Sequence, residues 1–281
     1  MIIDTHTHIY PDHQAGRIVK HLSHQAHLHA FSDGRADSLL QSMTEAGISV
    51  SLVLPVATRP DQVTKINRQM KELNESYKDQ IISLGAMHPY YSEYERELDW
   101  LKENGFKGIK VHPVYQSAQL DDPKYLKIFA RAKELDMAVV THAGIDIGAM
   151  DQVCCSPGMA RHVVEQIGPF KFVLAHMGGW HNWDEVIDTL KDTGVYLDTA
   201  FSTEAFTPLW DGYWKEEDTF MLSEEKMTEM IHAFGAERIL FGTDSPWSSQ
   251  KRVVEFIERL PLNNEDKEKI FSLNAKKIFE L

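Results

Sequence analysis

The sequence predicts an α/β fold, a parallel (β/α)8 barrel of the TIM type, with residues 1–281 forming a single domain. Two observations favour this fold. Short segments rich in Val, Ile and Leu alternate with amphipathic helical segments along the chain, and several of the apolar segments end in His or Asp. A length of 281 residues suits either one large barrel or two ordinary domains. The alternation of strands and helices along the whole chain favours the single barrel. An open doubly wound sheet is the alternative, but the first strand-to-helix turn lacks a glycine-rich phosphate loop.

The first predicted strand lies within residues 1–8, where Ile2 and Ile3 are apolar and Tyr10 with Pro11 ends the segment. We expect residues 12–32 to form a lid or helical loop over the site. This segment is rich in histidine, but the histidines do not keep to one helical face, which favours a solvated helix over a metal-binding tract. These residues are His13, His21, His24, His27 and His29.

The remaining strands are predicted from β-branched apolar runs at residues 49–55, 81–87, 108–111, 137–142, 172–176, 195–199 and 238–244. Apolar residues at helical spacing predict helices at 35–46, 61–77, 93–103, 124–135, 157–167, 184–191 and 224–234, with two more at 250–259 and 265–279. Gly47 and Gly105 are typical stop signals, and Pro157 suits the first turn of a helix. Each strand is thus followed by a helix.

The longest interruption of this pattern is the loop at residues 201–220. It places aromatic residues among acidic ones, and such a loop commonly covers a pocket or forms a subunit contact. We therefore regard a homodimer as a reasonable expectation. The aromatic residues of the loop are Phe206, Trp210, Tyr213, Trp214 and Phe220.

The composition excludes several classes of function. A formal net charge of −13 without a basic patch argues against nucleic acid or an anionic membrane as a partner. No apolar run is long enough to span a bilayer, and no signal segment precedes the first strand, so we expect a cytoplasmic protein. Cys154 and Cys155 are adjacent, which seldom permits a disulfide, and loop thiols are favoured over a soft-metal or redox role.

The residues that close the predicted strands are the strongest functional signal. In a parallel barrel the carboxyl ends of the strands converge, and His6 and His8 face the same side because strand residues alternate. Any one of these histidines could be a buried side chain bonded to backbone, but together they form a nitrogen and oxygen set suited to zinc, or to iron, manganese or nickel. The set comprises His6, His8, His112, His142, His176 and Asp244.

The motifs around these residues resemble the amidohydrolase superfamily. They are Asp-Thr-His-Thr-His at residues 4–8, Ala-His-Met-Gly-Gly at 175–179 and Gly-Thr-Asp-Ser-Pro at 242–246. His-Ala-Gly-Ile-Asp at 142–146 and Asn-Ala at 274–275 are similar to the amidohydrolase-related branch that includes aminocarboxymuconate semialdehyde decarboxylase. The resemblance spans the chain in order, and it does not specify a substrate.

The resemblance implies one divalent metal ion, usually zinc, held by His6, His8, His142 and Asp244. His176 would then be the base near the metal-bound water, a role that Asp244 could share, since a divalent ion lowers the pKa of bound water to about 7. It implies a metal-dependent hydrolase that cleaves an amide, lactone, ester or C–C bond in a small carboxylated substrate. The alternative is a non-oxidative decarboxylase of an aromatic or unsaturated acid, and the rival from another class is a non-catalytic metal-binding or sensor protein.

Further residues are candidates for substrate binding. Lys110 has three possible roles: a core lysine paired with an acid, a cation for a substrate carboxylate, or the carboxylated lysine that bridges two metals in binuclear relatives. We expect His112 to touch substrate, with a structural hydrogen bond as the alternative, and Arg59 is a candidate carboxylate clamp. Trp180 and Trp247 suit a planar substrate or half-buried packing. Asp4 is expected to bond to loop backbone.

Overall fold

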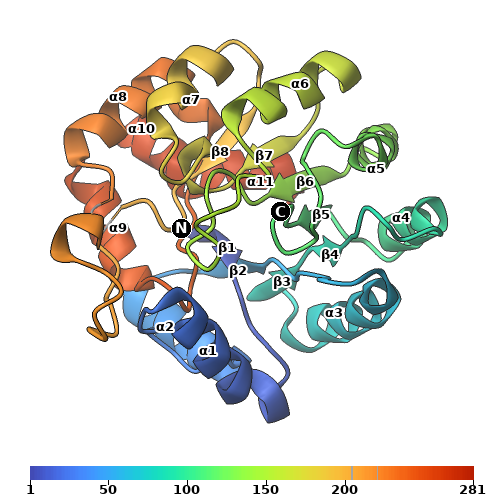
Figure 1. Cartoon of the computed structure of the whole chain (residues 1–281), viewed down its shortest axis with the longest axis horizontal. Coiled ribbons are helices and arrows are strands. Elements are labelled where there is room, and N and C mark those ends of the chain that lie inside the picture. Colours follow the sequence, from blue (N-terminus) through green and yellow to red (C-terminus); the bar gives the residue numbers. More distant parts are fainter. Residues whose placement is uncertain (204, 220) are drawn as a thin grey trace.

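The computed structural model describes residues 1–203, 205–219 and 221–281, and it is a barrel of parallel strands surrounded by helices (Figure 1). One run of paired strands has the order β1 (Ile3–Thr7), β2 (Val50–Val53) and β3 (Ile81–Ser83). The second run continues with β4 (Gly85–Ala86), β5 (Gly108–Val111), β6 (Ala138–Thr141), β7 (Phe172–Leu174), β8 (Tyr196–Asp198) and β9 (Ile239–Leu240).

The two runs form one closed barrel. β3 and β4 are separated only by Leu84, whose N–H donates to Val53 O at 3.0 Å, so they are two halves of the third barrel strand. β9 meets β1 because Thr5 N donates to Phe241 O at 2.8 Å and Asp244 N donates to His6 O at 2.8 Å. The predicted (β/α)8 barrel is confirmed. The strand predicted as continuous at residues 81–87 is interrupted at Leu84.

Helices surround the strands (Figure 1). The helices that follow strands and cover the barrel are α2 (Ala36–Ala46), α3 (Val63–Tyr77), α4 (Tyr94–Glu103), α5 (Pro123–Glu134), α6 (Pro157–Ile167), α7 (Trp183–Leu190), α8 (Glu224–Phe234) and α9 (Gln250–Arg259). Ser156, Ser223 and Ser249 begin α6, α8 and α9, because each hydroxyl accepts from a free backbone N–H of the first turn. Gly47 ends α2 with φ 70°.

Two predicted helices differ from the structure. The helix expected at residues 61–77 begins with a 3-10 turn at Pro60–Gln62, because Gln62 Oε1 accepts from the Arg59 and Thr58 N–H groups and tightens the first turn. The helix expected at 265–279 is composite: α10 (Asn264–Glu268) leads through a π-helical turn, Lys269–Leu273, into α11 (Asn274–Phe279).

The apolar core has two parts. The larger part lies between the strands and the surrounding helices. The smaller part fills the barrel interior, where Leu52, Leu84 and Val140 pack with Ile278 and Phe279 of α11. This helix therefore covers the end of the barrel opposite to the strand carboxyl ends, and the carboxyl ends are left for the site. None of the helices in the described ranges is long and apolar enough to cross a membrane.

The predicted lid at residues 12–32 contains α1 (Asp12–Ala26), which buries Ala15 and Val19. His13, His21 and His24 are exposed, as expected for a solvated helix. The aromatic loop packs against the segment that follows α1: Leu28 pairs antiparallel with Pro208, and Trp214 Nε1 donates to Ala26 O at 2.8 Å. Phe220 lies outside the described residues.

Candidate metal centre and active site

All the predicted site residues line one cavity of about 640 Å³ at the carboxyl ends of the strands. The strands place their terminal side chains inward because alternate residues point to the same side of a pleated strand. The predicted residues that line it are His6, His8, Arg59, Lys110, His112, His142, His176, Trp180, Asp244 and Trp247.

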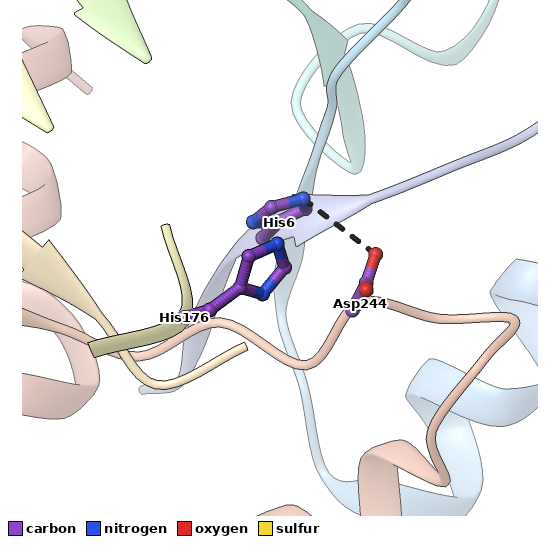
Figure 2. Close-up of side chains that lie close together, drawn as sticks. All are labelled: His6, His176 and Asp244. Atoms are coloured by element: carbon purple, nitrogen blue, oxygen red, sulfur yellow. Dashed lines mark ion pairs between the residues drawn. The ribbon is translucent and has the colours of Figure 1, made fainter. Parts of the chain in front are cut away.

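His6 is held by a carboxylate behind it. Its Nδ1 donates to Asp198 Oδ2 at 2.8 Å, so the proton of the neutral ring lies on Nδ1 and Nε2 carries a lone pair. Burial lowers the pKa of His6 well below its ordinary value, with a further contribution from the Lys110 charge. His6 is therefore neutral, and its Nε2 lies 3.6 Å from Asp244 Oδ1 (Figure 2).

His8 is fixed in the same tautomer by a different partner. Its Nδ1 donates to Leu54 O at 2.9 Å, which places the lone pair on Nε2, 3.0 Å from Asp244 Oδ1. Two lone pairs and a carboxylate thus face one another. No Lys or Arg among the described residues forms an ion pair with Asp244. Such a set of acceptors is the donor set of a divalent cation, so these three residues fit a metal ion.

Asp244 is a carboxylate at neutral pH. Burial alone would raise its pKa, but any positive charge on His6 or His8, and a hydrogen bond donated by His8, favour the ionised form and lower the pKa below the ordinary value. Its backbone has φ 66°, and the position is held by the Asp244 N–H bond to His6 O. The preceding Thr243 is bonded through both N and Oγ1 to Asp4, which therefore has the structural role expected of it.

His176 and His142 are linked to each other. His176 Nδ1 donates to Ala200 O at 2.9 Å, so its Nε2 accepts from His142 Nδ1 at 3.0 Å. The structure brings donor atoms of His6, His176 and Asp244 within 4.8 Å of one another (Figure 2), and His142 joins a second group with His112 and Asp146. His142 Nε2 is buried and lacks a hydrogen-bond partner among the described residues. The expected ligand His142 thus carries a lone pair on Nε2 that has no hydrogen-bond partner among the described residues, and its ring is bonded to His176, a member of the first group.

Lys110 is a buried cation at the base of the cavity. Its side chain is 1% exposed, and burial lowers its pKa to about 8 against the raising effect of Asp198 and Asp244. Its Nζ donates to His6 Nε2 at 3.5 Å. No carboxylate in the described parts of the chain forms an ion pair with Lys110, so the expected pairing with an acid is not what the structure shows.

His112 faces the cavity beside two residues that the sequence did not single out. Its ring stacks on Tyr115 at 4.1 Å between centroids, and its Nε2 lies 3.5 Å from Asp146 Oδ2. Tyr115 bonds to Asp146, and burial raises the pKa of Asp146 to about 6. Asp198 was also missed, although it closes β8 just as the chosen residues close their strands. That signal was present in the sequence.

The remaining candidates differ in their exposure. The Arg59 side chain is 63% exposed and bonds to Asp61 at 3.0 Å, so it lies at the edge of the cavity. Trp180 is buried, and its Nε1 contacts Met221 Sδ at 3.3 Å, while Trp247 is half-buried. Their positions fit both packing and contact with a planar ligand.

The chain belongs to the amidohydrolase family, whose sequence profile matches residues 3–281. It is an enzyme of the amidohydrolase superfamily. No curated protein matches it significantly in sequence.

Solved structures share its fold at low sequence identity. An uncharacterised TIM-barrel protein from Bordetella bronchiseptica is 16% identical with a TM-score of 0.75, over 99% of this chain and 98% of that chain. The 2,6-dihydroxybenzoate decarboxylase from Rhizobium is 17% identical with a TM-score of 0.69, over 99% and 98%. A dihydroxybenzoic acid decarboxylase from Polaromonas with bound manganese and 2-nitroresorcinol is 16% identical with a TM-score of 0.70, over 100% and 97%.

Proposed function

We propose that this protein is a metal-dependent, non-oxidative decarboxylase of a small aromatic or unsaturated acid. The observation that carries the proposal is the convergence of the His6 and His8 lone pairs on the Asp244 carboxylate. The similar decarboxylases support the choice of decarboxylation over the hydrolysis expected from the sequence.

We assign one divalent ion to His6, His8, Asp244 and His142, whose Nε2 lone pair is free. Zinc remains the first expectation from the donor set. Manganese is the ion in one structural relative, and both ions accept imidazole and carboxylate ligands. When bound, the ion would polarise a substrate oxygen and neutralise its charge.

The residues around this position supply binding and proton transfer. Lys110 is buried and forms no ion pair with a carboxylate of the described residues, and it binds the acid group of the substrate. Trp180 and Trp247 form walls for a planar ring. His176 exchanges protons through Nε2, because Nδ1 is committed to Ala200 O. Nε2 first takes up a proton from water, giving up its hydrogen bond to His142 Nδ1, and then passes this proton to the ring carbon that bears the carboxylate. The C–C bond then breaks, its electron pair returns to the ring, and CO2 leaves.

Hydrolysis of an ester, lactone, amide or C–C bond is the second candidate. One observation favours it: His176 lines the cavity, and its donor atom lies within 4.8 Å of the His6 and Asp244 donor atoms. A general base needs such a position to take a proton from an attacking water.

The test has two parts. Metal content is measured on protein purified without chelator, and one equivalent is expected, falling in His8→Ala and Asp244→Ala. The protein loaded with zinc or manganese is then assayed against hydroxybenzoates for CO2 release and against esters, lactones and amides for hydrolysis.

We expect CO2 release that falls at least a hundredfold in His176→Asn, since one general acid or base contributes roughly 10²–10⁴-fold. Exposed His24→Asn is the matched control. Hydrolysis without CO2 release would replace the decarboxylase by the second candidate.

A further inference from the structure

The cavity is larger than a single small acid requires. Its volume of about 640 Å³ lies in the range of roughly 300–1,000 Å³ found for drug-sized ligands, whereas a dihydroxybenzoate is one ring with three small substituents. The metal centre, Lys110 and His112 occupy its inner end. Residues of α1 and α3 also line the cavity, so it has room for a further group on the same ligand.

The outer wall is formed by two helices. On α1, Ile18 and Leu22 line the cavity at a spacing of four residues, and on α3, Ile66 and Met70 do the same. Apolar residues at this spacing normally pack against a neighbouring element. Here they line the same cavity from two elements, together with Gln14 of α1 and Lys65 and Gln69 of α3.

The two sides of this wall differ: Ile66 and Met70 of α3 also pack against the apolar core, whereas the α1 side chains do not. Ala15 and Val19 form the buried face of α1, whereas Ile18 and Leu22 are half-buried and do not belong to the apolar core or to the residues packed against it. Two half-buried branched side chains that line a cavity leave part of their apolar surface uncovered, and a bound apolar group would cover it.

We propose that the substrate is an acid with an apolar tail. Its reacting end lies at Lys110 and the metal centre, and its tail runs outward between α1 and α3, against Ile18, Leu22, Ile66 and Met70. The inner and outer ends line one continuous cavity, so a single ligand spans both. The reacting end rests on the proposed function, whereas the tail site rests on the two helices alone.

The test measures binding without turnover. Straight-chain carboxylates from acetate to decanoate are titrated by calorimetry into the zinc-loaded protein. The affinity is expected to rise about threefold to fourfold for each methylene that enters the wall, and to level off when the space is full. An affinity that does not depend on chain length would overturn the proposal.

The variants locate the tail. Leu22→Trp fills the space and is expected to abolish the dependence on chain length while acetate binding is unchanged. The control is His21→Trp, because His21 is the exposed neighbour on the same helix and does not line the cavity. Met70→Gln tests the opposite wall without adding volume, and thermal melting checks that each variant folds. A chain-length dependence that survives both Leu22→Trp and Met70→Gln would also overturn the proposal.

This experiment separates the two proposals. Dependence on chain length without CO2 release from any hydroxybenzoate leaves the tail site in place and rejects the decarboxylase. CO2 release from unsubstituted hydroxybenzoates with no effect of chain length retains the decarboxylase and rejects the tail.

Discussion

At the scale of single residues, the hydrogen bonds at Nδ1 of His6 and His8 decide which ring nitrogen can bind a metal ion. His6 and His8 are useful as ligands because Asp198 and Leu54 O take their Nδ1 protons and leave the lone pairs on Nε2. Asp198 also holds backbone, because its Oδ1 accepts from His176 N at 2.9 Å and from Ala200 N at 3.1 Å. One carboxylate therefore fixes the orientation of His6 and the backbone that carries His176.

We predict that Asp198→Asn weakens metal binding by about 10–100-fold. Two backbone N–H groups keep the amide oxygen in the place of Oδ1, so the new NH2 group faces His6 Nδ1 and moves the ring proton to Nε2. Chelator competition measures the dissociation constant, and exposed Asp184→Asn serves as the control. An affinity equal to that of the parent protein would show that Asp198 does not set the tautomer.

At the scale of elements, α11 closes the end of the barrel opposite to the carboxyl ends of the strands. Asn274 Nδ2 donates to Ala236 O and Ile239 O, both at 2.7 Å, and so ties the helix to the start of β9. Ile278 and Phe279 then enter the barrel interior. The Asn-Ala pair that supported the resemblance thus has a structural role in this chain.

Truncation of the Phe279 side chain is expected to be costly. Phe279→Ala removes a fully buried ring from the barrel interior and should lower the free energy of unfolding by about 3–5 kcal/mol. Urea unfolding followed by circular dichroism measures the change, with exposed Lys277→Ala as the control on the same helix. A loss below about 1 kcal/mol would mean that α11 contributes little to the interior.

At the scale of the whole molecule, the buried histidines couple stability to pH. Burial lowers the pKa of His6, His112, His142 and His176 below the ordinary value of 6.5. As the pH falls below 6.5, these histidines bind protons in the unfolded chain but stay neutral in the folded protein, so folding stability decreases. Three buried carboxyl groups have the opposite effect on stability. The pKa is raised to about 7 at Asp4, to about 6 at Asp146, and above the ordinary value at Asp198, so the folded protein binds these protons at a higher pH than the unfolded chain does.

The four histidines outnumber the three carboxylates. We therefore expect the metal-free protein to lose stability between pH 6.5 and 5, by about 1.4 kcal/mol per pH unit for each net proton. Urea unfolding at several pH values gives the slope, and His142→Asn should make it shallower by removing one such ring. A stability that is constant or rises over this range would contradict the expectation.

The sequence predicted the barrel and the inward-facing strand-end residues because both follow from local periodicity. Strand parity alone places His6 and His8 on one side of β1. Asp146 was missed because it lies in an irregular loop, where no periodicity tells which way a side chain points. The tail wall was missed because α1 and α3 approach the same cavity only after the barrel closes. Residue spacing also could not say whether His142 or His176 stands nearer to Asp244.

The α11 helix that fills the lower end of the barrel follows every strand in the sequence. A ribosome delivers all the strands before it delivers this helix, so Leu52, Leu84 and Val140 face water in the nascent barrel until α11 emerges. Exposed apolar surface of this kind makes a growing chain prone to aggregate and attractive to chaperones. The emergence of α11 is therefore the step that removes this apolar surface from water.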